Sequence, residues 1–570
     1  MFLSAAVGIL VDQVHMGWDD PISKYIPEFK RANDPRDCEE ITIRQALLHS
    51  IGLGRPQTLL LGPNGYFLGD EVTFVRVLRG TPRLDDDRDQ AVDADSDVVP
   101  HSESGADEPR KEEKGDVPRE APIGARQETF EGTVEGGSDR VDEGHERGYA
   151  EGHAKQVEKR SDEALHEEQR PRKRSKGAQE DQEEGPTKEG PTDTPGPQPV
   201  YNNLLYGLIA LAVQNASGQR YSDFVQENIL DPLDMRHTVV NRSKLESNLN
   251  VAHGYAQLQD GSYTRVATED YTDENHAPIL GAAGIRSSVN DMLEWTSTLL
   301  RAYHAPTEDS VVREIPTLWK SQRDIDGKVS YALGYYCGYL PVATIGGNGI
   351  NCRTEERDPS FFDAHTIGRD SPRRFFIGHN GVWSGYASAV FMFPETKSAV
   401  MALANGLNLS DAADWSAKIL TQALFDMKPH VDLLPLVKRE AGAWYRVFCE
   451  MLIEWLEHRS VPDREADLHE YIGKYEGFGT RITIFLQEET GRLAVMFNSC
   501  RKWTCDRELY NKDVYSFLPL TRDQMLTKGM VDWDDYNVGL LHFQRGPTEE
   551  VHRLCWMYDA TEPYANFEKV

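Results

Sequence analysis

Apolar residues dominate two segments near the beginning of the chain, and both segments predict buried helices. Most residues from 2 to 14 are apolar, and the turn-forming run 17–21 (Gly-Trp-Asp-Asp-Pro) ends this pattern. A helix that is apolar nearly all round is buried on all sides, so this run predicts a core helix. Residues Ile41 to Leu48 predict a second buried helix, with Thr42 as its N-cap.

Helical and strand patterns return after Val200. Residues Leu204 to Val213 are apolar, and Ser217-Gly218 behind them is typical of a helix that ends at a left-handed glycine. A further helix is expected from Tyr221 to Leu230, because Pro232 stops it. Apolar runs around a glycine-containing turn predict strands at 375–378, 387–393 and 398–403.

The last part of the chain changes from a helical pattern to a strand pattern. The segments Ile482–Leu486 and Leu493–Phe497 flank a glycine-containing turn and predict a β-hairpin. A helix before them is predicted by side chains that fall on one helical face: Trp444, Val447, Phe448, Met451, Leu452 and Trp455.

A long polar segment separates the two apolar regions. Residues 84–199 are rich in charged residues, Gly, Ser and Pro, and they contain few large apolar side chains. Such a segment cannot bury enough surface to offset the entropy of ordering it, so we expect a disordered acidic insertion. The basic run 170–176 resembles a nuclear-targeting patch, but a charge block in a mixed-charge segment is the favoured interpretation.

Charge and cysteine content exclude several classes of function. The net charge is −31, of which about half falls in the insertion, and this disfavours nucleic-acid binding. The seven cysteines form no zinc pattern and are expected to be reduced thiols. We find no apolar run long enough to span a membrane and no convincing signal-peptide cleavage site, so we expect a cytoplasmic protein that binds no membrane.

Several fixed phrases occur in an order that resembles a known family. These are Val7–Asp12, Trp18–Phe29, Ile41–Leu53, Tyr201-Asn202-Asn203-Leu204, Ile229–Met235, Gly281–Ser288 and His379-Asn380-Gly381. Together they resemble the serine β-lactamase and penicillin-binding-protein superfamily, in a fungal-type form related to class C β-lactamases. That superfamily also includes DD-peptidases, esterases, D-aminopeptidases and some acyltransferases.

The resemblance implies an α+β fold and a domain plan. We expect a β-lactamase/transpeptidase-like antiparallel sheet flanked by helices, with a helical subdomain, built from residues 1–83 and 200–430. Residues 84–199 would be the insertion and 431–465 a connecting helix. Residues 466–570 resemble a lipocalin-like antiparallel β-barrel domain.

The resemblance also implies an acylation chemistry and its residues. In the family a serine of a Ser-x-x-Lys turn attacks a carbonyl and becomes acylated. Tyr201 would be the base, although a phenol needs a nearby cation to act near neutrality. Asn203 would bind the acyl amide, and His379 would orient the substrate or assist Tyr201. Asn380 and Gly381 would help to bind substrate, Gly381 by permitting its close approach.

Taken alone, these residues have simpler interpretations. A tyrosine before two asparagines is more often a turn and helix cap, and a histidine before a glycine usually has no special function. His49 is interpreted as structural. We expect no metal and no cofactor.

One departure from the family pattern concerns the nucleophile. Met1-Phe2 occupies the pair that directly follows Ser-x-x-Lys in the family, so the lysine would precede Met1 and the serine would lie three residues earlier. Neither Ser4 nor Ser50 has a lysine three residues on. A misassigned start codon and a loss of the catalytic pair both explain this pattern, and the insertion could include intron sequence.

Three functions therefore remain open. The first is a serine hydrolase that acts on an amide or ester of a small-molecule or peptide acyl substrate, in secondary or peptide metabolism. The second is an acyltransferase of the same fold, and the third is a catalytically inactive binding or scaffold relative. Either enzyme requires Tyr201, Asn203 and His379 to converge on one cleft, with Met1 and Phe2 at its floor.

Overall fold

The structure is a computed structural model of the whole chain. It describes residues 1–30, 41–56, 60, 70–81, 200–240, 250–266, 277–342, 345, 366–383, 385–407, 409–462, 467–498, 505–527, 535–559 and 564–570. The expected insertion at 84–199, with its basic run, lies outside the described residues.

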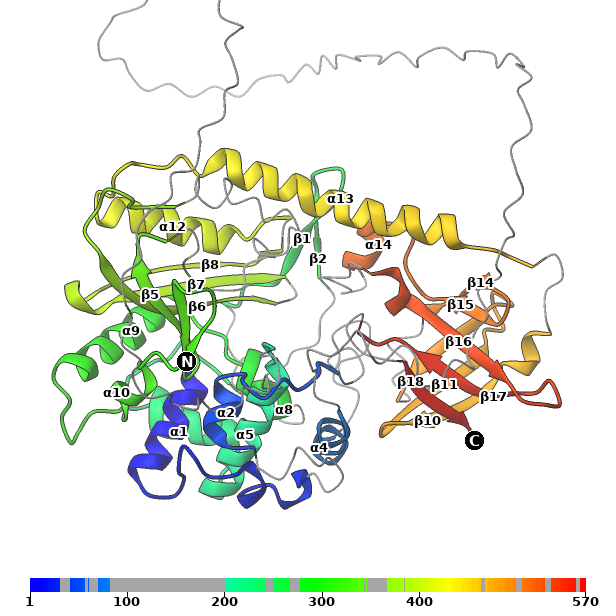
Figure 1. Ribbon diagram of the computed structural model, residues 1–570, viewed down its shortest axis with the longest axis horizontal. Coiled ribbons are helices and arrows are strands. Elements are labelled where there is room, and N and C mark those ends of the chain that lie inside the picture. Colours follow the sequence, from blue (N-terminus) through cyan, green and yellow to red (C-terminus); the bar gives the residue numbers. More distant parts are fainter. Residues whose placement is uncertain are drawn as a thin grey trace, which may run out of the picture. The chain divides into compact units, whose positions relative to one another are not determined.

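A six-stranded antiparallel sheet forms the centre of the first lobe (Figure 1). Its strands follow one another in chain order, so each strand pairs with the next in sequence. The turn between β6 and β7 includes Gly385, whose φ of 83° lies in the left-handed region that favours glycine. The strands are β3 Arg323–Asp324, β4 Val329–Ala332, β5 Tyr335–Leu340, β6 Arg374–Trp383, β7 Tyr386–Phe393 and β8 Ser398–Ala404.

Buried helices pack together beside this sheet, as the apolar patterns predict. Helix α1 (Phe2–Asp12) is buried from Phe2 to Leu10, and α5 (Asn203–Ser217) is buried from Leu204 to Val213. The α2 helix begins after Thr42, whose side chain accepts a hydrogen bond from Gln45 while the Gln45 side chain accepts one from Thr42. The helices of this group are α1, α2 (Ile43–Leu47), α4 (Glu71–Gly80), α5, α6 (Tyr221–Val225) and α8 (Ala277–Ala283).

Two longer helices cover the faces of the sheet. Helix α12 (Ala412–Leu424) contacts β7 and β8, and α9 (Val289–His304) contacts β8. Figure 1 shows α12 on one face of the sheet and α9 with α10 (Ile315–Leu318) on the other. A small three-stranded sheet joins β1 (Tyr255–Gln257), β2 (Tyr263–Arg265) and β9 (Gly406–Leu407).

A 25-residue helix, α13 (Leu434–His458), leads into the C-terminal lobe. The predicted apolar face is largely buried, with Met451 and Trp455 at 2% and 1% exposure, whereas the side chain of Trp444 lies outside the described residues. The Trp455 indole donates a hydrogen bond to the Ser516 hydroxyl (3.0 Å), so the end of α13 is anchored on the C-terminal sheet.

The C-terminal lobe is a nine-stranded antiparallel sheet whose two edge strands follow each other closely in the chain. Strands β13 and β14 stand at opposite ends of the strand order, yet only Arg507 separates them in the chain. The sheet therefore curls into a barrel-like form. Its strands are β10 Gly473–Gly477, β11 Thr480–Leu486, β12 Leu493–Phe497, β13 Cys505–Asp506, β14 Glu508–Asn511, β15 Val514–Ser516, β16 Leu540–Arg545, β17 Val551–Trp556 and β18 Ala565–Lys569.

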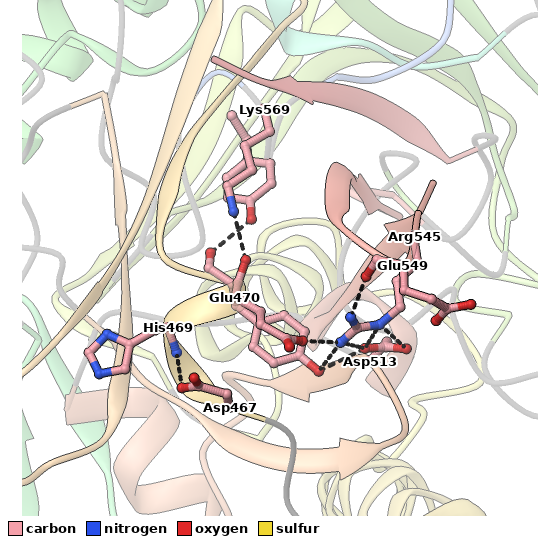
Figure 2. A network of polar contacts seen from close by, with 9 residues as sticks. Asp467, His469, Glu470, Asp513, Arg545, Glu549 and Lys569 are labelled. Carbon is pink, nitrogen blue, oxygen red and sulfur yellow. Dashed lines mark hydrogen bonds and ion pairs between the residues drawn. The ribbon is translucent and has the colours of Figure 1, made fainter. Parts of the chain in front are cut away.

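A polar network ties several parts of this lobe together (Figure 2). The Arg545 guanidinium donates to both oxygens of Asp513 (2.9 and 3.1 Å) and to a carboxylate oxygen of Glu470 (2.7 Å). The Tyr471 hydroxyl also donates to Asp513 (2.7 Å), and Lys569 near the C-terminus donates to the backbone oxygen of Glu470. The network thus joins β16, the β14–β15 turn, the segment before β10 and the last strand.

Some predicted helix boundaries differ from the observed ones. The first helix ends at Asp12 instead of residue 14. The helix expected from Tyr221 to Leu230 divides into α6 and a π-helical turn, Gln226–Leu230.

Candidate functional site

Asn202 fixes the loop that carries the first two candidate residues. Its side-chain oxygen caps α5 by accepting a hydrogen bond from the Leu204 backbone (2.9 Å). Its side-chain nitrogen donates to the backbone oxygens of Leu53 (3.3 Å) and Gly54 (2.9 Å), and its backbone N–H donates to His49 Nδ1 (3.1 Å). Only 1% of Asn202 is exposed. Its neighbours Tyr201 and Asn203 are therefore held at the beginning of α5.

Tyr201 and Asn203 contact each other directly. The Tyr201 hydroxyl donates a hydrogen bond to Asn203 Oδ1 (3.1 Å). The Tyr201 ring lies against the fully buried ring of His49, with centroids 4.3 Å apart. Because His49 Nδ1 accepts a hydrogen bond from Asn202, the proton of the neutral ring is on Nε2. His49 is structural, as predicted, and it also positions the loop of Tyr201.

Strand β6 presents His379 and Gly381 on one face and Asn380 on the other. Successive strand residues point to opposite faces. His379 is half-buried and Gly381 is exposed, while Asn380 is only 5% exposed. The Asn380 side chain therefore points away from the face that carries His379, and its role in substrate binding stays a prediction. Its backbone oxygen instead faces His379 Nδ1 at 2.5 Å.

The part of the predicted site at the beginning of α5 lies next to the part on strand β6. The Tyr201 and His379 rings have centroids 6.2 Å apart. Tyr331 on β4 contacts both sides, since its ring lies 5.3 Å from that of His49 and its hydroxyl lies 3.1 Å from His379 Nε2. The expected convergence of Tyr201, Asn203 and His379 is thus found in the geometry, whereas their chemical roles remain a prediction.

Burial leaves both candidate catalytic groups uncharged at neutral pH. Desolvation raises the pKa of Tyr201 to about 12, so roughly one phenol in 100,000 is ionised at pH 7. Burial lowers the pKa of His379 to about 4. Tyr201 therefore needs an additional cation beside it before it can serve as a base.

The residues at the beginning of α1 do not form the expected cleft floor together. The Phe2 ring stacks on that of Trp295 in α9, with centroids 4.3 Å apart, and Phe2 is 7% exposed. Phe2 thus belongs to the core between α1 and α9, while Met1 is half-buried.

Neither a metal-binding group nor a membrane-spanning helix occurs in the described part of the chain. No group of three or more His, Cys, Asp or Glu side chains in that part could hold a metal ion. No helix there is long and apolar enough to cross a membrane.

Comparison with known proteins identifies the family. The family profile named Beta-lactamase matches residues 1–90 and 161–423, which is more than half of the chain. The chain belongs to the beta-lactamase family. The match includes every residue of the candidate site, from His49 to Gly381.

Curated relatives in the beta-lactamase family are distant. The chain is 24% identical to a beta-lactamase of Escherichia coli K12 over 218 residues, covering 38% of this chain and 54% of that protein. It is 22% identical to penicillin-binding protein 4* of Bacillus subtilis 168 over 208 residues, covering 36% and 39%. The chain thus spans about half the length, or less, of these relatives.

Two solved structures are similar to this chain at low identity. The octameric penicillin-binding protein homologue from Pyrococcus abyssi is 14% identical with a TM-score of 0.43, covering 100% of this chain and 86% of that one. The class C beta lactamase from Rhodobacter sphaeroides is 14% identical with a TM-score of 0.41, covering 74% and 83%.

Two serines near the beginning of the chain, Ser4 and Ser50, are held in the structure. Ser4 is fully buried within α1, and the Ser50 hydroxyl donates to the Gln45 backbone oxygen (3.2 Å). The one Ser-x-x-Lys string of the sequence, Ser499 to Lys502, lies outside both the family match and the described residues.

Sequence reasoning missed the residues that hold the site together. Asn202, Tyr206 and Tyr331 were not predicted to take part. Asn202 carries a usable signal, because an asparagine directly before an apolar helix is a preferred N-cap. Tyr331 carries none, since its contact with His379 depends on the pairing of β4, β5 and β6.

Proposed function

We propose that this site is an acylation site for an amide or ester bond of a small-molecule or peptide acyl substrate. The observation that carries the proposal is the meeting of Tyr201, bonded to Asn203, with His379 at the junction of α5 and β6. Among chains of the beta-lactamase family, we assign this one to a fungal-type serine hydrolase of secondary or peptide metabolism. No observation favours acyl transfer to an alcohol or amine over transfer to water.

The chemistry follows from where each group lies. A serine would attack the carbonyl and pass its proton to the ionised form of Tyr201, and Tyr201 would give that proton to the amine or alcohol that leaves when the amide or ester bond breaks. In its neutral form the Tyr201 hydroxyl is oriented by Asn203. Because burial holds the pKa of Tyr201 at about 12, the reaction needs the ammonium of the family lysine beside it. Gly381 is exposed on the face that carries His379, so it leaves room for the substrate over β6.

The proposal places the nucleophile in a Ser-x-x-Lys turn directly before Met1, and a variant that carries such a turn can be made. One variant carries Ser-Ala-Ala-Lys fused to Met1, and its matched control carries Ala-Ala-Ala-Lys. Both are incubated with a fluorescent penicillin and with a fluorophosphonate. We expect stoichiometric labelling of the added serine and no labelling of the control or of the chain as printed.

Tyr201→Phe in the serine-bearing chain tests the base. We expect its labelling rate to fall on the order of 10²- to 10⁴-fold, the usual contribution of a general base. Labelling of the alanine control would show that another serine reacts. A serine-bearing chain that melts cooperatively but reacts with neither probe would refute the proposed function and favour a binding or scaffold role.

We further propose the domain division on which this site depends. Residues 1–83 and 200–430 would form the catalytic domain, 431–465 a connecting helix and 466–570 a lipocalin-like domain, with 84–199 as a dispensable insertion. Loop-closure entropy grows only with the logarithm of loop length, so a short Gly/Ser linker in place of 84–199 should leave a cooperative melt. Loss of that melt would show that the insertion is structural.

A further inference from the structure

A chain of four hydrogen-bond contacts runs from His379 into the interior. It begins at the Asn380 backbone oxygen, which lies 2.5 Å from His379 Nδ1. His379 Nε2 lies 3.1 Å from the Tyr331 hydroxyl, and that hydroxyl lies 3.2 Å from the Tyr206 hydroxyl. The Tyr206 hydroxyl lies 3.0 Å from the Leu47 backbone oxygen, where the chain ends. Tyr206 and Tyr331 are 7% and 0% exposed.

The two ends of the chain fix where two of its protons are. A carbonyl oxygen only accepts hydrogen bonds, so a proton must lie on the His379 side of the Asn380 contact. At 2.5 Å two lone pairs would repel, and the neutral imidazole therefore has its proton on Nδ1. For the same reason the Tyr206 proton points to Leu47.

The neutral side chains have one proton fewer than the number of contacts in this hydrogen-bond chain. A neutral imidazole and two phenols supply three protons for the four contacts of the chain. The Tyr331 proton can lie toward His379 Nε2 or toward Tyr206, and the other contact then joins two lone pairs. If His379 Nε2 gains a proton, it donates to Tyr331, Tyr331 donates to Tyr206, and all four contacts are filled.

We propose that Tyr331 and Tyr206 are positioning residues that prepare His379 to take up one proton beside Tyr201. Burial opposes that protonation. The hydrogen-bond chain favours it, because a buried contact between two acceptors with no proton between them costs free energy. Tyr331 is fully buried behind His379, so it acts through the imidazole. The use of this proton in acyl transfer rests on the proposed function, whereas the protonation itself does not.

The other titratable groups around His379 leave this assignment in place. The ring faces Tyr201 before α5 and Tyr336 on β5, with centroids 6.2 and 4.8 Å away. Burial is the main cause that lowers the pKa of His379, a charge on the Met1 amino group at α1 would lower it further, and the charge of His379 in turn disfavours that of His49. Arg323 lies beyond Tyr331, with its guanidinium 5.5 Å from the Tyr331 ring centroid.

Hydrogen–deuterium exchange at the imidazole C2 position, followed by peptide mass spectrometry, measures the protonation of His379 in the full-length protein. The decisive variant is Tyr206→Phe, which removes one hydroxyl that does not touch His379. In this variant neutral His379 and Tyr331 hold two protons for two contacts, so the gain from protonation disappears. We expect the protonation constant of His379 to fall about tenfold, the effect of roughly one buried hydrogen bond, with a fall also in Tyr331→Phe.

The matched control is Tyr335→Phe, because Tyr335 is equally buried and its hydroxyl is outside the chain. We expect it to leave the protonation constant of His379 within about twofold of the parent. An unchanged or higher protonation constant in Tyr206→Phe would overturn the proposal, and Tyr331→Phe decides the matter if Tyr206→Phe does not fold. The measurement needs no turnover, so its failure is distinct from a failure of probe labelling.

Discussion

The rings of Tyr201 and His379 lie 6.2 Å apart, centroid to centroid, although one residue precedes a helix and the other belongs to the middle of a sheet. Each is held by its own neighbours. The loop of Tyr201 is fixed by Asn202 and His49, and the ring of His379 is fixed by Asn380 and Tyr331. The site is therefore preorganised from two sides by buried hydrogen bonds.

Asn202→Ala should loosen the Tyr201 side of the site. It removes a helix cap and two hydrogen bonds to backbone oxygens, and it leaves buried groups without partners. We expect a loss of about 2–4 kcal/mol in the free energy of unfolding, measured with urea. Asn215→Ala removes one exposed hydrogen bond to Tyr25 from the same helix and should cost less than about 1 kcal/mol. Equal losses in both variants would contradict the buried role of Asn202.

The sequence predicted the elements of the fold better than the contacts of the site. The Thr42 cap, the helix ending at Ser217 and the hairpin from Ile482 to Phe497 follow from patterns within a few residues. Such local patterns carry their own physical cause, because caps, periodicity and turn residues act over one or two turns of chain.

The contacts between elements had no such local signal. Tyr331 meets His379 only because β4, β5 and β6 pair in one register, and no pattern around residue 331 specifies that register. Strand alternation turns the Asn380 side chain to the face opposite that of His379, and this could have been derived from the strand prediction itself. The expected role of Asn380 in substrate binding stays a prediction.

Two glycines of β6 should respond differently to substitution. A Cβ at Gly378 would lie 2.0 Å from the Val390 backbone oxygen, whereas a Cβ at Gly381 would meet only the Ser388 hydroxyl, at 3.4 Å. We expect Gly378→Ala to lose about 3 kcal/mol or more of folding free energy, because β6 and β7 must separate. Gly381→Ala should melt like the parent protein.

Gly381→Ala then becomes a test of substrate approach. In the chain that carries the added Ser-Ala-Ala-Lys turn, its labelling by a fluorescent penicillin should slow at least about tenfold, because the methyl group fills space over β6. Unchanged labelling would show that substrate does not pass over Gly381.

Arg545 should be a major stabilising residue of the C-terminal lobe (Figure 2). Its side chain and that of Asp513 are 17% and 14% exposed. Burial opposes the ionisation of Asp513, but hydrogen bonds from Arg545 and Tyr471 outweigh it and hold the pKa of the carboxyl below its usual value. Arg545→Met leaves this carboxylate without its cation, so we expect a loss of about 2–4 kcal/mol at pH 7.

The matched control for Arg545 is Arg553→Met. Arg553 pairs with Glu568 at 2.6 Å, but the two side chains are 35% and 54% exposed, so the loss should be under about 1 kcal/mol. The stability that Asp513 contributes is present above its unfolded pKa and disappears as pH falls through the lower folded pKa. The difference between Arg545→Met and the parent should therefore shrink in acid, and a difference that grows in acid would contradict this account.

A buried acidic cluster joins α12 to α13 and should make the stability depend on pH. Glu440 of α13 is 4% exposed and accepts hydrogen bonds from the Ser410 hydroxyl (2.5 Å) and the Trp415 indole (2.6 Å). In α12, Lys418 and Asp414 form a buried ion pair (2.7 Å). Burial raises the pKa of Glu440 to about 7, and Ser410, Trp415 and Lys418 only partly oppose it while Asp414 adds to it. Burial likewise raises the pKa of Asp411 to about 6.

The direction in which Glu440 changes folding stability with pH follows from its pKa values in the unfolded and folded states. Between the ordinary pKa of 4.5 and the folded pKa of about 7, the folded protein binds more protons at this residue than the unfolded chain does. Folding stability from Glu440 should therefore fall as pH rises through this window and stay level above it.

Glu440→Gln keeps an acceptor for Ser410 and Trp415 but carries no charge. Relative to the parent, it should gain on the order of 2 kcal/mol of unfolding free energy between pH 5 and pH 8, measured by urea titration at each pH. Glu457→Gln, on the exposed part of α13, is the matched control for the loss of a carboxylate from this helix. If the stability of the parent protein rises between pH 5 and 7 while that of Glu440→Gln stays level, the fold favours the ionised form of Glu440 and this account is wrong.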